Sequence, residues 1–174
     1  MMPPLAAYKH LCDAADSQLL VVDIQQRLAR VMADDDRARV IRNAGILSQA
    51  AGLLGVPLTV SEQYPKGLGR TVPELVEALR EGDGPEVPVL EKTDFSACGD
   101  SGLLPSLSSP DRGCVLVCGI ETHVCVQQSV HDLLREGFGV HVAVDAVGSR
   151  RSGDKDVALR RLERAGAVLT TSEM

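Results

Sequence analysis

Aromatic residues are almost missing from this chain of 174 residues, which contains two Phe, two Tyr and no Trp. A hydrophobic core must therefore be built from Val, Leu, Ile and Ala, and few rings are left to stack on nucleobases. Positive charge is also in deficit, because 18 Lys and Arg stand against 24 Asp and Glu and leave a net charge of −6. Proteins that bind nucleic acid or anionic membranes usually present a basic patch. We therefore expect neither a nucleic-acid partner nor a membrane partner.

Long apolar runs and closely spaced cysteine pairs are missing as well. No run approaches the ~20 residues of a membrane-spanning helix, and residues 1–10 lack the basic and apolar segments of a signal peptide. The five cysteines form no CxxC pair, which favours reduced thiols over a disulfide framework or a structural zinc site. These absences predict a cytoplasmic protein. The length suits one domain, which we expect to span residues 1–174.

Short apolar runs alternate with segments of helical periodicity along the chain. Expected strands are residues 19–22, 56–60, 87–90, 115–118, 140–145 and 165–169. Expected helices with one apolar face include residues 36–54, 72–79 and 154–164, together with a helix that begins after Thr122. This alternation predicts a three-layer α/β/α architecture with a six-stranded, mostly parallel, Rossmann-like sheet.

Three ionisable side chains follow three of the expected strands. Asp23 ends the first, Lys92 lies just past the third, and Cys125 opens the helix after the fourth, with Thr122 as its expected N-cap. Strand ends of this kind share one edge of a parallel sheet, where ligands bind. A thiol in the first turn of a helix lies at the positive end of the dipole, which predicts a lowered pKa. Taken singly, Cys125 is equally well explained as a small apolar filler.

Several segments agree in order and spacing with one known family. The segment GIETHVCV at residues 119–126 resembles the isochorismatase-like cysteine hydrolases, in their metal-independent branch. The resemblance extends to LLVVDIQ at residues 19–25, SEQYPKGLGRTVPEL at 61–75, EKTDFSAC at 91–98 and VHVAVDAVGSR at 140–150. It implies the isochorismatase-like hydrolase fold and assembly into a homo-oligomer.

The resemblance also implies a catalytic triad of Asp23, Lys92 and Cys125. Cys125 would be the nucleophile, Asp23 its base, and Lys92 the cation that keeps the pair charged and oriented. The implied reaction is hydrolysis of a small carboxamide-like or ureide-like substrate through a thioester-type intermediate. A cis peptide between Ile120 and Glu121 is implied too, with an oxyanion hole formed by the backbone N–H groups of Glu121 and Cys125.

Five further side chains are candidates for the walls of the substrate pocket. Gln25 follows Asp23 by two residues, so it could contact substrate, orient Asp23 or meet solvent. His123 could line the pocket or lie on the surface. The candidates are Gln25, Gln63, Tyr64, Phe95 and His123.

A catalytic metal and other cofactors are not expected. Nicotinamidases are similar to this chain, but they carry an Asp-x-His element and a further His as metal ligands. Here residues 61–64 read SEQY, and no His lies between His10 and His123, so a divalent site at this edge has no evident source. Two alternatives to a cysteine hydrolase remain open: isochorismatase-type hydrolysis of a vinyl ether, and a non-catalytic oligomeric scaffold.

Overall fold

Six parallel strands form one sheet in this computed structural model, which describes residues 11–80, 87–99, 102–107 and 112–174. The strand order is β3-β2-β1-β4-β5-β6. The strands are β1 (Ser17–Val22), β2 (Leu58–Gln63), β3 (Val89–Lys92), β4 (Cys114–Ile120), β5 (Gly139–Gly148) and β6 (Val168–Thr170). The expected domain bounds of 1–174 include residues outside the described ranges.

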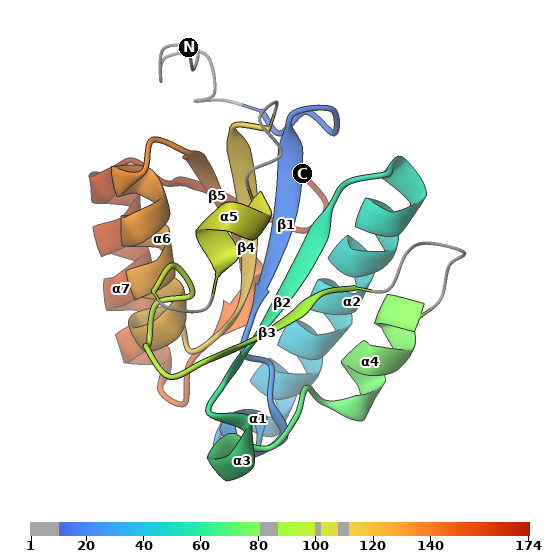
Figure 1. Cartoon of the computed structure of the whole chain (residues 1–174). Coiled ribbons are helices and arrows are strands. Elements are labelled where there is room, and N and C mark those ends of the chain that lie inside the picture. The colour runs from blue at the N-terminus through green and yellow to red at the C-terminus, as the bar shows by residue number, and fades with distance from the viewer. Residues whose placement is uncertain (1–10, 81–86, 100–101, 108–111) are drawn as a thin grey trace.

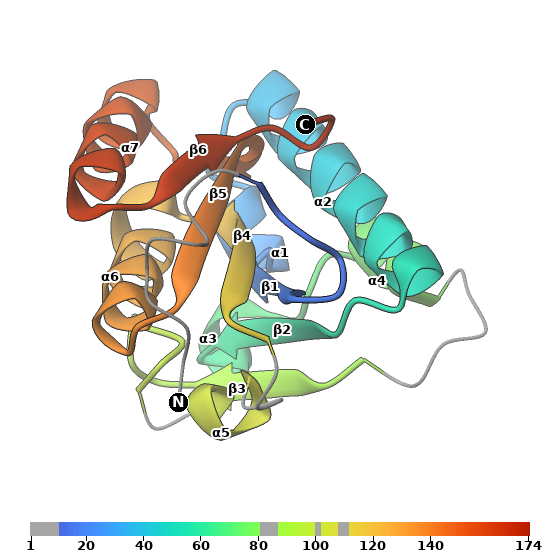
Figure 2. The same ribbon diagram turned by 90° about the horizontal axis from the view of Figure 1, so that it is seen from above.

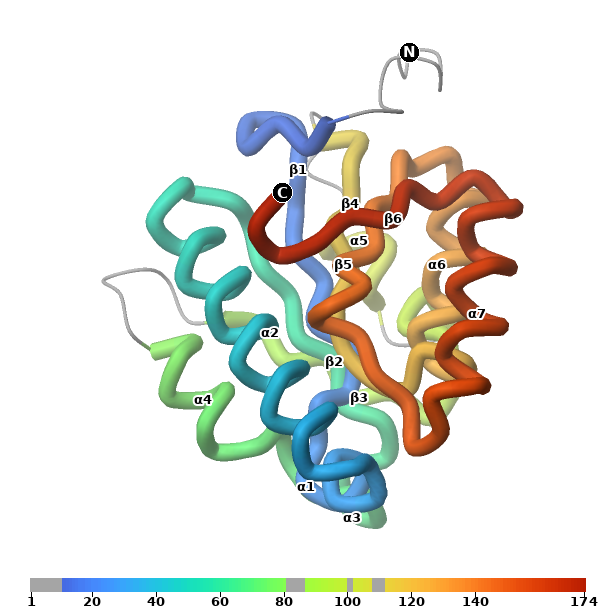
Figure 3. The backbone as a smooth tube through the Cα atoms, turned by 180° about the vertical axis from the view of Figure 1, so that it is seen from behind, coloured from blue at the N-terminus to red at the C-terminus, as the bar shows by residue number. Residues whose placement is uncertain are grey.

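Helices lie on both faces of this sheet. They are α1 (Gln26–Ala29), α2 (Asp34–Leu54), α3 (Pro65–Leu68), α4 (Pro73–Arg80), α5 (Leu103–Leu107), α6 (Gln127–Arg135) and α7 (Ser152–Ala165), with a π-helical turn η2 (Thr122–Val126) before α6. Figure 1 and Figure 2 show α2 and α4 against one face and α6 and α7 against the other. The view from behind in Figure 3 shows the same two layers on either side of the strands. The predicted three-layer architecture is confirmed.

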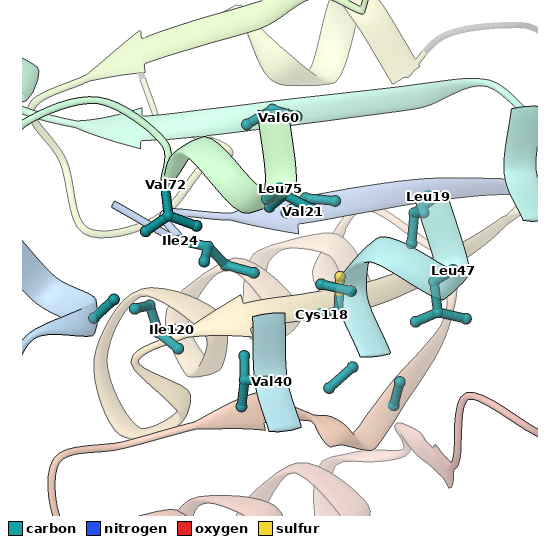
Figure 4. Packing of buried hydrophobic residues seen from close by; sticks show 14 of the residues in the cluster. Leu19, Val21, Ile24, Val40, Leu47, Val60, Val72, Leu75, Cys118 and Ile120 are labelled. Atoms are coloured by element: carbon teal, nitrogen blue, oxygen red, sulfur yellow. The ribbon is translucent and has the colours of Figure 1, made fainter. Parts of the chain in front are cut away.

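The core is divided between the two faces of the sheet, and β1 contributes to both. Leu19 and Val21 point toward α2 and α4, in a cluster that Figure 4 shows with Leu47 and Leu75. Leu20 and Val22 belong to the cluster beneath α6 and α7. Because side chains alternate along a strand, a strand buried on both faces contains a continuous apolar run, which in β1 is residues 19–22 after the buried polar Ser17 and Gln18. This is why a continuous apolar run correctly predicted β1.

Several predicted boundaries differ from the structure, and each difference has a local cause. Strand β2 continues to Gln63 and β3 includes Lys92, because these polar residues pair with each other in the parallel ladder. The predictions had ended both strands at their last apolar residue. The last strand begins later than predicted, since α7 continues to Ala165 and ends at Gly166, whose φ of 108° is left-handed. Among the described residues, no helix combines the length and the apolar character that crossing a membrane requires.

Candidate active site

Asp23 directly follows β1 and turns its carboxylate into the protein. Its backbone has a left-handed φ of 50°, and its side chain has 0% exposure. The Ser61 hydroxyl donates to Oδ1 at 2.8 Å, and Oδ2 lies 2.7 Å from Lys92 Nζ. Left-handed backbone costs a non-glycine residue about 1–3 kcal/mol and is typical of functional sites. The surrounding contacts therefore hold the carboxylate in a fixed direction.

Lys92, the last residue of β3, is just as deeply buried, with its side chain 1% exposed. Besides the ion pair, Nζ donates to Gln63 Oε1 at 2.7 Å and to the carbonyl oxygens of Phe95 at 3.0 Å and Asp94 at 3.2 Å. An ammonium group has three hydrogens and no acceptor. These oxygens therefore surround it with acceptors and hold the charge in place.

Cys125 lies in η2 with 5% exposure, and its thiol is near enough to Asp23 and Lys92 for both charges to act on its pKa, in opposite directions. Its pKa is raised to about 12, because burial and the charge of Asp23 raise it more than Lys92 lowers it. The predicted lowering by the helix terminus is therefore wrong for the resting protein, in which desolvation dominates. The thiol is protonated and needs a base in order to react.

The first turn of η2 is capped by the backbone of Glu121 and not by the predicted Thr122 side chain. The carbonyl of Glu121 accepts from the N–H groups of Val124 at 3.0 Å and Val126 at 3.2 Å. Thr122, the predicted N-cap, has a buried hydroxyl without a hydrogen-bond partner among the described residues, and no side chain caps this turn. The prediction failed because the chain enters a π-helical turn, in which a backbone carbonyl takes the place of the side-chain cap.

The peptide bond between Ile120 and Glu121 is cis. The Glu121 carboxylate, 4% exposed, forms a two-pronged ion pair with Arg150, in which Nε donates to Oε1 at 2.9 Å and Nη2 donates to Oε2 at 2.6 Å. The backbone N–H of Arg150 adds a third contact to Oε1 at 2.9 Å. Burial raises the pKa of Glu121, but the hydrogen bonds from Arg150 outweigh it and leave that pKa lowered. This pair ties the turn before Cys125 to the end of β5.

Two of the predicted pocket residues are occupied in positioning other groups. The Gln25 amide donates to the carbonyls of Gln63 at 2.9 Å and Gly69 at 2.6 Å, and its oxygen accepts from Gln63 N–H at 2.8 Å. Gln63 accepts from Lys92 and donates to the carbonyl of Thr93 at 2.7 Å. The Gln25 side chain therefore neither meets solvent nor bonds the Asp23 carboxylate, and both amides support the loops around Lys92.

The other three predicted pocket residues lie nearer the surface. Tyr64 and Phe95 are each 54% exposed, so about half of each side chain is open to solvent. His123 Nδ1 lies 3.0 Å from the Ser149 hydroxyl, and its Nε2 is 4.0 Å from Asp154 Oδ2. His123 is therefore turned toward the start of α7.

Three positioning residues were missed in the sequence: Ser61, Ser129 and Arg150. Ser61 pairs with Val22 in the ladder between β1 and β2, which places it beside Asp23. Ser129 accepts from Ala97 N–H at 2.8 Å and donates to the Cys125 carbonyl at 2.7 Å. It thus joins the loop after Lys92 to the turn that carries the thiol. Ser61 lies two residues before Gln63, so the two side chains are on the same face of β2. That spacing was the one sequence signal that could have identified Ser61 as a site residue.

A hollow of about 600 Å³ lies elsewhere, between α1, the start of α2 and the start of α4. Arg27, Arg30 and Arg37 are among its lining residues, whereas the acid, amine and thiol described above are not. We place the candidate active site at Asp23, Lys92 and Cys125, because there a buried ion pair of acid and amine acts on a buried thiol.

Known proteins resemble the chain in sequence and in structure. Residues 17–174 match the family model described as the isochorismatase domain. Isochorismatase domain-containing protein 2 of Danio rerio is 40% identical over 159 residues, which cover 90% of this chain and 75% of the relative. Isochorismatase family protein 1B of Dictyostelium discoideum is 36% identical over 158 residues, with the same coverage of 90% and 75%.

Solved structures agree with these relatives. The MAR1 ribonuclease from Caenorhabditis elegans has a TM-score of 0.84 and 41% identity, and the match covers 93% of this chain and 80% of that one. YcaC from Pseudomonas aeruginosa, solved with hexane-2,5-diol and covalent acrylamide, has a TM-score of 0.81 and 26% identity over 93% and 79% of the two chains. Because the family model and close relatives cover nearly the whole chain, this protein belongs to the isochorismatase family and is a hydrolase of that family.

Proposed function

We propose that the protein is a metal-independent cysteine hydrolase that acts on small carboxamide-like or ureide-like substrates. The observation that carries this proposal is the buried Asp23–Lys92 ion pair, whose two charges both act on the pKa of the Cys125 thiol. A thiol with a raised pKa is a poor nucleophile by itself. A carboxylate within its reach supplies the base that hydrolysis requires.

The reaction follows from these three groups. Asp23 takes the thiol proton as the Cys125 sulfur attacks the substrate carbonyl carbon, and the carbonyl π electrons move to its oxygen. The N–H groups of Glu121 and Cys125 would bind that oxyanion. Asp23 then returns the proton to the leaving nitrogen, the C–N bond breaks, and a thioester remains. Water, deprotonated by Asp23, attacks the thioester, and the sulfur leaves with that proton to regenerate the thiol and release the acid.

Lys92 stabilises the negative charge that passes between Asp23 and Cys125 during the reaction. Its ammonium group lies 2.7 Å from Asp23 Oδ2 and lowers the pKa of Cys125 against the opposing effects of burial and Asp23. When the proton moves from sulfur to Asp23, negative charge moves from the carboxylate to the thiolate. A fixed cation beside both groups stabilises the charge at either position.

The choice of a neutral acyl substrate is supported by charge, and the choice of a nucleophile by one structural relative. YcaC from Pseudomonas aeruginosa was solved with covalent acrylamide, which alkylates thiols at its vinyl carbon, and this supports a reactive nucleophile in the present chain. The nematode relative is named a ribonuclease, but a phosphodiester would bring an anion beside the buried carboxylate of Asp23 in a chain of net charge −6. A neutral carbonyl carries no such cost.

The test is hydrolysis of a panel of simple amides and ureides by the full chain, with ammonia release as the readout. We expect Cys125→Ala to lose turnover by roughly 10³-fold or more with an unchanged melting temperature. Cys12→Ser is the matched control, because it removes a thiol that precedes β1, whereas Asp23 follows that strand. Brief reaction followed by mass spectrometry should detect the acyl adduct on the peptide that contains Cys125.

Other outcomes separate the alternatives. Undiminished activity of Cys125→Ala on a vinyl ether would replace the proposal with ether hydrolysis. Absence of turnover by the parent chain across the panel would favour the scaffold.

We also propose a cytosolic homo-oligomer, on the basis of five free cysteines and of Leu53 and Leu54, exposed on α2. Light scattering of the purified chain tests the assembly, and an observed mass of one chain would contradict it.

A further inference from the structure

We propose a zinc-binding site at the opposite end of the sheet from the candidate active site, formed by Cys12, Cys114 and His141. Cys12 precedes β1, Cys114 is the first residue of β4, and His141 lies near the start of β5. The candidate active site lies beyond the other ends of these strands. This inference is therefore independent of the proposed hydrolase activity.

The three side chains offer ligand atoms at metal-binding spacing. The two sulfurs lie 4.0 Å apart, and the three candidate ligand atoms all lie within 4.8 Å of one another. Tetrahedral zinc with Zn–S bonds of about 2.3 Å and Zn–N bonds of about 2.0 Å requires ligand atoms about 3.5–3.8 Å apart. Small side-chain rotations would close the difference.

The backbone holds these three positions together. In the ladder between β4 and β5, Cys114 pairs with Gly139, and His141 lies two residues further along β5, which is the same face of the sheet. The segment with Cys12 is tied to the start of β4 by Arg112, whose Nη1 donates at 2.6 Å to the carbonyl oxygens of Ala14 and Ser17. The site is therefore built from structure that exists without a metal.

A fourth polar group points at the same place. Ser17 is 5% exposed, and its hydroxyl has no hydrogen-bond partner among the described residues. Ser17 pairs with Cys114 in the ladder between β1 and β4, which puts both side chains on the same face of the sheet. A buried hydroxyl without a partner costs free energy, which a bound ion, or water on that ion, would offset.

The ligand types select the metal. Two thiolates and one imidazole suit a borderline-soft ion such as Zn²⁺ and do not suit Mg²⁺ or Ca²⁺, which prefer oxygen. Binding would displace one proton from each thiol, so two thiolates balance the charge of the ion. Cys12 and Cys114 are separated by 102 positions, which is why cysteine spacing gave no reason to expect zinc. The bound ion would join the segment before β1 to β4 and β5 and so stabilise the fold.

The test is a zinc titration of the full chain, reduced beforehand, in competition with a chromophoric chelator. We expect one equivalent to bind, and Co²⁺ in its place should show thiolate-to-cobalt charge-transfer absorption. Cys12→Ser should weaken binding by at least 100-fold and abolish the rise in melting temperature that zinc causes. Cys12 is exposed, so this variant should fold, and His141→Gln provides a second loss of ligand.

Two controls keep the other thiols apart from this site. Cys125→Ala and Cys98→Ser should bind zinc as the parent does, which assigns the metal to Cys12 and Cys114. Failure of the reduced parent chain to bind zinc would overturn the proposal. So would parent-like affinity in Cys12→Ser, or a Cys12–Cys114 disulfide whose reduction leaves a chain without zinc affinity.

Discussion

Lys92 Nζ lies 2.7 Å from Asp23 Oδ2, and the two side chains are 1% and 0% exposed. They come from β3 and the end of β1, with β2 between them in the sheet. Burial makes such a pair costly to form and still more costly to break, because a single partner is left as an unpaired charge. The sheet therefore carries a fixed pair of opposite charges directly beside the Cys125 thiol.

Asp23→Asn should change the reactivity of Cys125 and the turnover in opposite directions. The charge of Asp23 raises the pKa of Cys125, so its removal should lower that pKa and speed alkylation by iodoacetamide in mild base. The same change removes the base, so we expect turnover to fall by about 10²–10⁴-fold. Alkylation is followed by mass spectrometry of the peptide that contains Cys125, and turnover by ammonia release.

The control for this variant is its stability. Asp23→Asn leaves Lys92 buried without its counter-charge and should lower the free energy of unfolding by about 3–5 kcal/mol. The double variant Asp23→Asn/Lys92→Met removes both charges and should recover most of that loss without recovering turnover. Parent-like turnover in Asp23→Asn would show that another group is the base.

The reactivity of Cys125 in the free protein should continue to rise far into alkaline pH. Its pKa is raised to about 12 by burial and by Asp23, against Lys92, so the thiolate fraction grows up to that value. The denatured chain should reach its plateau near the ordinary thiol pKa of about 8.5–9. Alkylation rates at a series of pH values measure this difference, and the peptide that contains Cys98, whose pKa is about 11, is an internal comparison. A plateau in the alkylation rate of Cys125 below neutral pH would contradict a raised pKa for this thiol.

The same shift has a consequence for stability. The folded pKa of Cys125 exceeds the unfolded one, so above about pH 9 the unfolded chain releases this proton while the folded chain keeps it. The contribution to stability is complete below the unfolded pKa and is lost as pH rises from there through about 12. Urea unfolding of Cys125→Ala should therefore depend less on pH in this range than unfolding of the parent chain.

Local sequence information was sufficient for the architecture and for the positions of the three ionisable residues. Apolar runs end where strands leave the core, so Asp23 and Lys92 were correctly expected at the carboxyl ends of their strands, and their catalytic roles stay a prediction. What could not be predicted depends on distant packing. The pKa of Cys125 depends on its burial, the role of Gln63 on the β2–β3 register, and the contact of Cys12 with Cys114 on segments far apart in the chain.

Arg150→Met should destabilise the turn before Cys125. It removes the guanidinium from a Glu121 carboxylate that is 4% exposed, and we expect a loss of about 1–3 kcal/mol in the free energy of unfolding. Turnover should fall as well, because the Glu121 N–H is a proposed oxyanion donor. Arg151→Met is the matched control, since it removes the same charge from an exposed neighbour.

Acid should weaken this pair in a defined direction. The pKa of Glu121 is lowered, because the hydrogen bonds from Arg150 outweigh burial. The stabilisation is therefore present above the ordinary pKa of about 4.5 and is lost as pH falls through the folded value. Urea unfolding at pH values on either side of this range should show less acid sensitivity in Arg150→Met than in Arg151→Met. Equal acid sensitivity would mean that the pair does not control the ionisation of Glu121.

Gly119→Ala should be among the most damaging small substitutions in this protein. Gly119 pairs with Val22 across β1 and β4 and has a φ of 126°, and a Cβ there would lie 2.0 Å from the carbonyl oxygen of Val22. Both strands must separate beside Asp23 to accept it, so we expect a loss of roughly 3 kcal/mol or more, measured by urea unfolding. The control is Gly52→Ala on α2, where a Cβ meets nothing within 4 Å and helix propensity predicts a gain of up to about 1 kcal/mol. If both variants unfold at the urea concentration of the parent chain, the close approach of β1 and β4 does not hold Asp23 in place.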